Sequence, residues 1–394
     1  MSPSKNNLSF ENTEIAFRHS SNADLNRAYW LFKIINVNFL VKVGPPITNF
    51  AVKIGLPIKG IIKATIFKHF CGGETIRECE GTIKSLHAGG VGTILDYSIE
   101  GEDDEKVFDN TGEEIIRTVR RAAKDTAIPI TVFKTTGIGR FHLLEKLDAK
   151  TALTEEETAE WAKVQNRVLA ICQKAYETGI PVMIDAEETW IQDTIDTLAL
   201  DMMRRFNRKK IIVYNTYQLY RHDKLQSLKN DHETAVKEGF ILGAKLVRGA
   251  YMEKERKRAA EMGYPSPIQP DKTSADKDYN AALVYCTEHI GTLAIVAGTH
   301  NEDSCRLLAN LITEKQIDHN HPHIYFSQLL GMSDNLSFNL ADAKYNVAKY
   351  VPYGPVKAVL PYLFRRAQEN TAIAGQMSRE LSLISKEVKR RKKG

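Results

Sequence analysis

The pattern of hydrophobic and polar positions changes close to Gly89-Gly90. Before that point apolar residues recur at helical spacing. After it, short β-branched runs alternate with longer amphipathic stretches. Several runs are almost continuously apolar and end in polar residues, as parallel strands buried on both faces do. The eight runs are residues 91–98, 130–136, 181–188, 210–218, 243–251, 293–301, 323–331 and 346–354.

Eight strand–helix units in succession predict an α/β fold, a closed (β/α)8 barrel of the TIM type. An open doubly wound sheet is less favoured, because no G-x-G-x-x-G follows the first run. A P-loop also lacks support, since G-x-x-x-x-G-K-[ST] is missing from the sequence. The pattern thus favours a barrel whose function lies at the carboxyl ends of its strands.

Helical segments flank this barrel and give a three-part organisation. Residues 1–88 are expected to form a helical arm, residues 89–375 the barrel, and residues 376–394 a C-terminal amphipathic helix with a basic tail. In the arm we expect helices over about 21–43, within 47–70, and over about 74–86. The C-terminal helix has one apolar stripe, spaced by 3, 4, 3 and 4 residues. Its members are Ala374, Met377, Leu381, Ile384 and Val388.

Composition and charge narrow the function classes. Apolar residues make up 43% and charged residues 26%, which excludes a wholly disordered or fibrous chain. The net charge is 54 − 49 = +5, and the last nine residues alone carry +5. The remaining 385 residues are therefore balanced, whereas a nucleic-acid enzyme usually spreads its excess positive charge over a binding face. No nucleic-acid partner is expected.

The cysteines and the N-terminus bear on localisation. The five cysteines are far apart and include no C-x-x-C, which fits a reducing compartment better than a disulfide framework or a zinc ribbon. The first residues show neither a secretory nor a transit pattern, and no stretch reaches the roughly 20 apolar residues of a membrane span. We expect a cytoplasmic protein or a peripheral one at the inner face of the cell membrane.

The polar residues at the strand ends include cations suited to an anionic ligand. Arg365-Arg366 follows the eighth run, and two guanidiniums there could grip a carboxylate or phosphate. Alternatively, one of them is a surface residue paired with Glu369. In the fifth run, Lys245 and Val247 face one side of the strand, and Leu246 and Arg248 the other. Lys245 or Lys134 could instead be the Schiff-base lysine of an aldolase or lyase.

Two acidic or histidine-rich stretches suggest a metal, but weakly. Asp185 and Glu187 share one strand face, yet a carboxylate network that holds the barrel lysines is the more natural interpretation. The 319–323 stretch precedes the seventh strand, so it belongs to the barrel's opposite end, where residues serve stability. No metal site is expected. His300-Asn301 is a candidate for binding a nucleotide, with a core histidine as the alternative.

A set of motifs, in this order, resembles the proline dehydrogenase family, in its monofunctional, mitochondrial-like branch. The similarity extends from about Lys63 to Ala374. Each motif is weak alone, but the order is specific. The motifs are FCGGET (70–75), LDYSIEGE (95–102), IDAEE (184–188), NTYQ (215–218), KLVRGAY (245–251), THN (299–301), QLLGM (328–332) and YVPYG…FRRAQEN (350–370).

The resemblance implies FAD as cofactor and oxidation of L-proline to Δ1-pyrroline-5-carboxylate by hydride transfer to flavin N5. A membrane quinone is implied as electron acceptor. Arg365 and Arg366 would bind the proline carboxylate, oriented by Glu369 and helped by Lys63. The remaining catalytic candidates are Asp96, Leu246, Tyr251 and Tyr350. The implied cofactor-binding residues are Asn215, Gln218, Lys245, Val247, Arg248, Gly249, Ala250, Thr299, His300 and Asn301.

This chain departs from the family's bacterial pattern at two positions. It has Lys245 where many bacterial members have Arg, and Asn215 where many have Gln. Lys59 rivals Lys63, because the spacing upstream of FCGGET varies. With 394 residues, no room is expected for the aldehyde dehydrogenase domain of bifunctional relatives. Besides the Schiff-base lyase, a non-enzymatic adaptor that docks through the basic C-terminal helix is the other alternative. For the enzyme, the basic tail is a candidate contact with an anionic membrane surface, and a solvated, disordered tail is the alternative.

Overall fold

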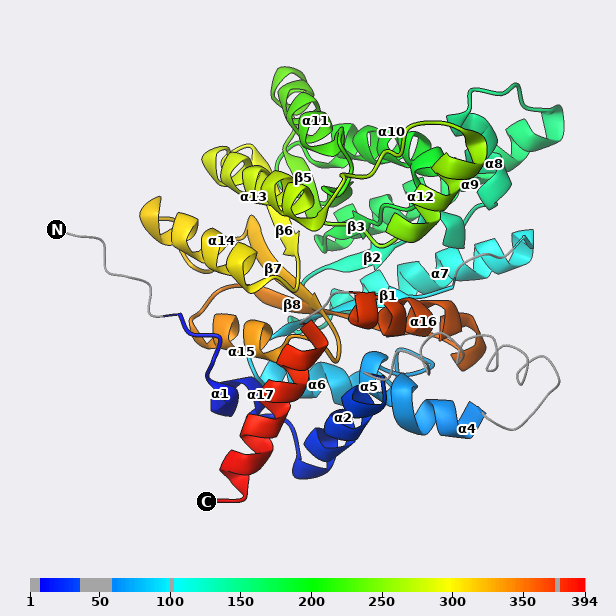
Figure 1. Cartoon of the computed structure of the whole chain (residues 1–394). Helices are drawn as coiled ribbons and strands as arrows, with labels where there is room; N and C mark the ends of the chain where they lie inside the picture. The colour runs from blue at the N-terminus through cyan, green and yellow to red at the C-terminus, as the bar shows by residue number, and fades with distance from the viewer. Residues whose placement is uncertain (1–7, 36–58, 100–102, 373–375, 394) are drawn as a thin grey trace.

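The computed structural model describes residues 8–35, 59–99, 103–372 and 376–393 of the 394-residue chain (Figure 1). Its centre is a closed barrel in which each of eight strands pairs in parallel with the next, and β1 pairs with β8. Seven strands lie within the predicted runs and β5 begins one residue before its run, so the predicted (β/α)8 barrel is confirmed. The strands are β1 (Gly92–Tyr97), β2 (Thr131–Phe133), β3 (Val182–Ile184), β4 (Val213–Gln218), β5 (Leu242–Val247), β6 (Leu293–Gly298), β7 (Ile324–Leu329) and β8 (Val347–Tyr353).

Helices connect successive strands and surround the barrel, as Figure 1 shows. Their order follows the predicted alternation, with additional segments in several connections. They are α7 (Glu105–Ala122), the 3-10 turn η2 (Thr135–Gly137), α8 (Phe141–Asp148), α9 (Glu155–Thr178), α10 (Thr189–Phe206), α11 (Lys224–Glu238), α12 (Met252–Met262), α13 (Lys272–Glu288), α14 (Glu302–Glu314), α15 (Asp334–Asp342) and α16 (Val356–Ala372).

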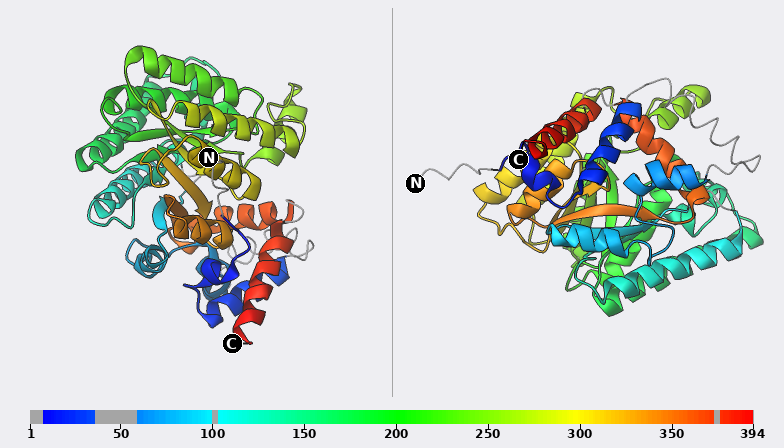
Figure 2. Two further views of the ribbon diagram at one scale, coloured as in Figure 1. Left: turned by 90° about the vertical axis from the view of Figure 1, so that its left-hand side faces the viewer. Right: turned by 90° about the horizontal axis from the view of Figure 1, so that it is seen from below.

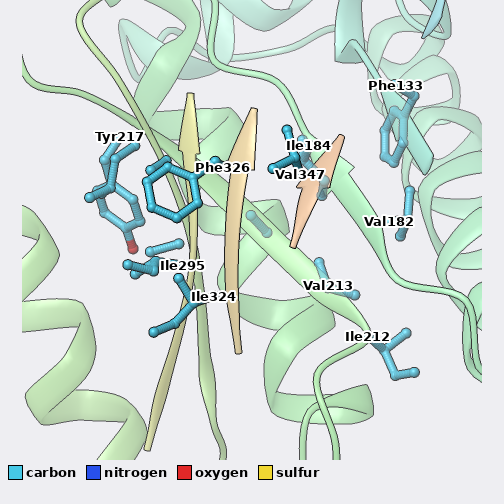
Figure 3. Close-up of a cluster of buried hydrophobic side chains, with 14 of the residues drawn as sticks. Phe133, Val182, Ile184, Ile212, Val213, Tyr217, Ile295, Ile324, Phe326 and Val347 are labelled. Carbon is cyan, nitrogen blue, oxygen red and sulfur yellow. The ribbon is translucent and has the colours of Figure 1, made fainter. Parts of the chain in front are cut away.

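Alternation along the strands separates two hydrophobic cores. Inward-facing side chains fill the barrel, and outward-facing ones pack against the helices. The inner core includes Ile94, Met183, Tyr214, Val296 and Ala348. The outer core takes the neighbouring positions (Figure 3), among them Ile184, Val213, Tyr217, Ile295 and Phe326. Toward the carboxyl ends of the strands the inward positions become polar.

The N-terminal arm is helical, although its helices begin and end differently from the prediction. The helix α2 spans Asn22–Ile35, and the rest of the helix expected to residue 43 lies outside the described residues. The third expected helix begins later, as α6 (Glu80–Ala88). The other segments are α1 (Thr13–Phe17), α4 (Lys59–Ile62), the π-helical turn η1 (Lys63–Phe67) and α5 (Lys68–Phe70).

The C-terminal helix α17 (Gln376–Arg391) lies beside α1 and α2 in the views of Figures 1 and 2. Its Leu381, Ile384 and Val388 pack in one hydrophobic cluster with Phe17 and Phe32 of the arm. The predicted apolar stripe therefore exists, but the arm covers the part of it whose side chains are described. That part is not a free surface for an interfacial membrane helix. Among the described residues, no helix is both long and apolar enough to cross a bilayer.

The tail is helical as far as Arg391 and holds the arm by polar contacts as well. The buried Glu387 accepts hydrogen bonds from Arg390 and Arg391, at 2.9 and 2.8 Å. Arg391 also donates to the carbonyl oxygens of Phe17 and Ser20. Part of the C-terminal positive charge is thus used inside the protein. The helix α17 therefore packs directly on α1 and α2 of the arm. The three-part division of the chain stays a prediction.

Candidate active site

A cavity of about 620 Å³ opens at the carboxyl ends of the strands. Every strand, or the residues directly after it, contributes to the lining, because these ends meet at one rim of the barrel. Residues from the strands and their ends are Asp96, Lys134, Asp185, Gln218, Lys245, Val247, Thr299, Leu329 and Tyr350. The helices α16 and α17 add Tyr362, Arg365, Arg366 and Arg379.

A buried ion pair stands at the centre of the cavity floor. Lys245 Nζ donates hydrogen bonds to Asp185 Oδ1 at 2.6 Å and to the Tyr350 hydroxyl at 2.8 Å. The Tyr350 hydroxyl donates to the same Asp185 oxygen at 2.7 Å. Burial raises the pKa of Asp185, but the charges of Lys245 and Lys134 outweigh it and hold that pKa well below its usual range. Asp185 is therefore an ionised carboxylate among buried cations.

A second lysine completes this cluster. Lys134 Nζ lies 3.0 Å from Asp185 Oδ2 and 3.6 Å from Asp96 Oδ2. The carboxylate network expected to hold the barrel lysines is therefore confirmed at Asp185. Asp185 carries these lysines rather than a metal. Among the described residues, no three His, Cys, Asp or Glu side chains come together as a metal ion would need.

Arg248, directly after β5, connects the end of β5 with the residues that follow β6. Arg248 donates to Asp276 at 2.6 Å, to Thr299 Oγ1 at 2.8 Å and to Ser304 Oγ at 2.9 Å. Thr299 Oγ1 also accepts from the backbone N–H of Asn301 at 3.1 Å. These bonds fix the turn between β6 and α14. They leave a cationic wall beside the cavity.

His300 is held neutral beside this turn. Burial lowers its pKa to about 3. The backbone N–H of Leu329 donates to Nε2 at 3.4 Å, so Nδ1 carries the proton and donates to Ser333 Oγ at 2.9 Å. Ser333 in turn donates its backbone N–H to Glu380 of α17 at 2.5 Å. His300 can therefore offer the cavity a neutral polar ring but no charge.

The backbone after β5 requires glycine at one position. Gly249 has φ +135°, which L side chains rarely adopt, and a Cβ there would lie 2.3 Å from the Tyr220 ring. The backbone of Gly249 and Ala250 thus lies open on the cavity lining. A flat or extended ligand could approach the main chain there.

The two arginines of α16 both reach the cavity. Arg365 lies over the Tyr251 ring, with Cζ 5.9 Å from the ring centroid. Arg366 is 7% exposed and lies over the Tyr362 ring at 5.2 Å. The alternative in which one of the pair faces away from the site is therefore wrong. Together with Lys245, they make this end of the cavity suited to a carboxylate.

Comparison with known proteins agrees with the sequence motifs. The profile described as proline dehydrogenase matches residues 79–379. The chain belongs to the proline dehydrogenase family. The predicted family and the predicted enzyme class, proline dehydrogenase, are therefore confirmed.

Several known proteins are similar to this chain over much of its length. Proline dehydrogenase 1, mitochondrial, of Dictyostelium discoideum is 34% identical and covers 94% of this chain and 73% of its own. The human enzyme of that name is 43% identical over 60% of this chain and 40% of its own. The carbapenem antibiotics biosynthesis protein CarD of Pectobacterium carotovorum subsp. carotovorum is 33% identical. That match covers 82% of this chain and 83% of CarD.

A solved structure shares the fold. Proline utilization A of Bdellovibrio bacteriovorus, inactivated by N-propargylglycine, superposes with a TM-score of 0.72 at 19% identity. The superposition covers 93% of this chain but only 40% of that one. At this identity the likeness supports the barrel fold and not the details of the site.

Most of the family's site residues lie on the cavity as expected. Of the catalytic candidates these are Asp96, Tyr251, Tyr350, Arg365 and Arg366. Of the cofactor-binding candidates they are Gln218, Lys245, Val247, Arg248, Gly249, Ala250, Thr299, His300 and Asn301. Their roles stay predictions. The side chain of Glu369 lies outside the described residues.

Three predicted placements are wrong. Leu246 and Asn215 occupy outward-facing positions of β5 and β4, so both side chains are fully buried behind the barrel wall. Lys63 lies in the arm, where Nζ pairs with Glu74 at 2.7 Å and with Glu78 at 3.1 Å. These two carboxylates hold Lys63 at a second, separate hollow and away from the barrel mouth.

The sequence reasoning also missed residues of the lining. Leu329 and Met332 supply apolar side chains to the lining. Both belong to the QLLGM motif, which the resemblance already included without a role. Arg379 comes from α17 and pairs with Glu302 at 3.0 Å. No local signal in the sequence places a residue of the C-terminal helix beside β6.

Proposed function

We propose that this chain oxidises L-proline to Δ1-pyrroline-5-carboxylate with FAD as cofactor. The observation that carries the proposal is the meeting of Arg365 and Arg366 with an apolar wall and aromatic rings in one cavity. Proline has the same two sides, a carboxylate and an apolar ring. A cationic end and an apolar end in one cavity suit such a small zwitterion.

The residues present fit a flavin. Gln218 Oε1 is buried and has no hydrogen-bond partner among the described residues. Leaving it so costs roughly 1–3 kcal/mol, which an N–H of the flavin ring would recover. The Gly249–Ala250 segment lines the cavity, and Arg248 beside it suits a diphosphate. The residues that would hold the flavin are Gln218, Lys245, Val247, Arg248, Gly249, Ala250, Thr299, His300 and Asn301.

When bound, the flavin supplies a hydride acceptor at N5. The protein's part is to orient and bind proline. Arg365 and Arg366 would take the carboxylate in charge-assisted hydrogen bonds. Tyr251, Leu329 and Tyr350 would enclose the ring and keep water from it.

The cations of the site also act on the substrate's proton. The ring nitrogen of proline must lose its proton before a hydride can leave the adjacent carbon. Lys134, Lys245, Arg365 and Arg366 surround the cavity, and nearby positive charge favours the neutral form of an amine. We infer that the site lowers the pKa of bound proline, and that Asp185 limits the effect by offsetting the charge of Lys245.

We further propose that a membrane quinone takes up the electrons and that the protein works in the cytoplasm, at the inner face of the membrane. Because the arm covers the described part of the α17 stripe, contact would rely on charge. Lys389, Lys392 and Lys393 are exposed at the end of α17. Basic residues at an anionic surface each add about 1 kcal/mol of attraction.

One experiment tests the cofactor and the reaction together. The purified protein should show the visible absorption of oxidised flavin, and L-proline should bleach it without oxygen. A colourless protein that forms a borohydride-trapped adduct at Lys245 or Lys134 would instead support the Schiff-base lyase. A protein with neither bound flavin nor turnover would support the non-enzymatic adaptor instead.

A further inference from the structure

The amide of Gln218 has a fixed orientation at the end of β4. Its Nε2 donates to the backbone carbonyl of Glu187 at 3.0 Å, which directs the amide nitrogen toward the strand end of β3. Its Oε1 is buried and has no partner among the described residues, and Gln218 is one of the residues that line the cavity. Gln218 can thus present only an acceptor to whatever occupies the cavity.

The carbonyl that holds Gln218 is itself fixed from behind the barrel wall. The backbone N–H of Glu187 donates to Gln192 Oε1 at 2.7 Å. The Glu187 side chain accepts from the Thr136 backbone N–H at 3.0 Å. Gln192 is 0% exposed, on the first turn of α10. Glu187 is therefore held at both its main chain and its side chain.

Gln192 depends on a carboxylate one turn further along α10. Its Nε2 donates to Asp196 Oδ1 at 2.8 Å. Asp196 also accepts from Asn215 Nδ2 at 2.9 Å and from the buried ammonium of Lys224. Asn215 Oδ1 accepts from the backbone N–H of Thr216 at 2.9 Å. Because Gln192 Nε2 donates to Asp196, it points away from Glu187, and the oxygen of the same amide faces the Glu187 N–H.

This chain of hydrogen bonds leads from the outside of the barrel to one cavity atom. It runs from Asp196 through Gln192 and the Glu187 backbone to Gln218. Asp196 determines which end of the Gln192 amide faces Glu187, and the Glu187 carbonyl determines which end of the Gln218 amide is left for the cavity. It also explains Asn215, which does not reach the cavity but binds the carboxylate at the start of the chain.

We propose that Gln192 and Asp196 are positioning residues for the cofactor. They hold the Gln218 carbonyl toward the cavity, where it accepts a hydrogen bond from the flavin ring. The oxidised flavin ring has a single N–H, flanked by two carbonyls, and it requires an acceptor at that point. The inference rests on the proposed function, since it takes flavin to be the occupant.

Flavin affinity of the stripped protein tests this inference without using turnover. FAD is removed, and its dissociation constant is measured by quenching of flavin fluorescence. Gln218→Met should raise the Kd about 5-fold, as expected for one neutral hydrogen bond. Gln192→Met keeps a similar volume and should raise Kd about 3-fold. In the double variant, Gln192→Met should add nothing to Gln218→Met, because it acts only through that amide.

Two further variants complete the set. Gln173→Met makes the same change at an exposed site of α9 and should leave Kd unchanged. Gln192→Leu removes the same amide with a side chain of different shape, so it should raise Kd to a similar extent. It takes the place of Gln192→Met if that variant does not fold.

The outcomes separate the inference from the proposed function. If Gln192→Met weakens FAD binding equally with and without Gln218, the relay is wrong and Gln192 is structural. If Gln218→Met and Gln192→Met both bind FAD like the unchanged protein, the inference fails while the flavin proposal stands. If the unchanged stripped protein takes up no FAD, the proposed function fails first.

Discussion

Tyr350 on β8 and Asp185 after β3 are joined across the barrel mouth by a hydrogen bond of 2.7 Å. Lys245 contacts both partners, and its Nζ also lies 4.3 Å from the centroid of the Tyr350 ring. The ring is therefore fixed by its hydroxyl at one end and by the strand at the other. A ring held in this way cannot move aside for a bulkier substrate.

The fixed ring predicts selectivity for proline over trans-4-hydroxyproline. A hydroxyl on the substrate ring would crowd Tyr350, whereas Tyr350→Ser opens space and should narrow the ratio of kcat/KM between the two substrates. Tyr350→Phe is the matched control, because it removes the bonds to Asp185 and Lys245 but keeps the ring. Equal kcat/KM for both substrates in the unchanged protein would contradict the assignment.

The arginine pair predicts a loss of substrate affinity. Arg365→Met or Arg366→Met removes one charge-assisted hydrogen bond to a carboxylate, worth roughly 1.5–3 kcal/mol, so KM for proline should rise about 10- to 150-fold. The KM for L-prolinamide, which has no carboxylate, should rise much less in the same variants. Steady-state kinetics measure both substrates.

Lys357→Met is the control for this pair, since Lys357 is an exposed cation on the same helix. It should leave KM unchanged. If both arginine variants kept the proline KM of the unchanged protein, the carboxylate would have to bind elsewhere.

The barrel could be predicted because its signal is local and repeated. Each parallel strand is buried on both faces, so each appears as a nearly continuous apolar run. Motifs at the ends of those runs, such as THN at 299–301, then fall at one rim by topology alone. To place such a residue at the rim, it is enough to know which strand it follows. The resemblance to the family gives that information.

The wrong placements arise where the face of a strand matters. Lys245 and Leu246 are neighbours on β5, so only one of them can point into the barrel. A motif identifies both residues without saying which faces inward, and the same applies to Asn215 and Gln218 on β4. Lys63 was placed wrongly and Arg379 was missed for another reason. Their positions depend on long-range contacts of the arm and α17, which no local pattern encodes.

Glu380 predicts a stability effect that depends on pH. Burial raises its pKa to about 7, with Asp334 adding to the shift and Lys349 opposing it. An acid with a raised pKa binds more protons in the folded protein, so stability falls as pH rises from about 4.5 to 7. The loss is of order 3 kcal/mol. Glu380→Gln cannot ionise, so its advantage over the unchanged protein should grow across this range.

Thermal midpoints between pH 5 and 8 measure this difference. Glu387→Gln on the same helix is the control, because ion pairs hold the pKa of Glu387 at about 2 despite burial. The loss of stability caused by Glu387→Gln should therefore be constant from pH 5 to 8. A difference between Glu380→Gln and the unchanged protein that stays flat with pH would mean that Glu380 is ionised throughout.

The exposed lysines at the end of α17 predict electrostatic binding to membranes. Truncation would be a poor test, because α17 also carries Ile384 and Glu387 into the contact with the arm. Replacing Lys389, Lys392 and Lys393 by Gln keeps the helix and removes three charges. At about 1 kcal/mol for each charge, binding to anionic vesicles should weaken roughly 100-fold at low salt.

The matched control replaces three exposed lysines elsewhere by Gln, namely Lys84, Lys124 and Lys237. It should bind vesicles nearly as well as the unchanged protein, because the charges it removes do not cluster. Turnover of the tail variant should fall with a quinone embedded in the vesicles and stay constant with a soluble dye, since the cavity is intact. If the tail variant sediments with anionic vesicles as completely as the control at low salt, the C-terminal charges are not the membrane contact.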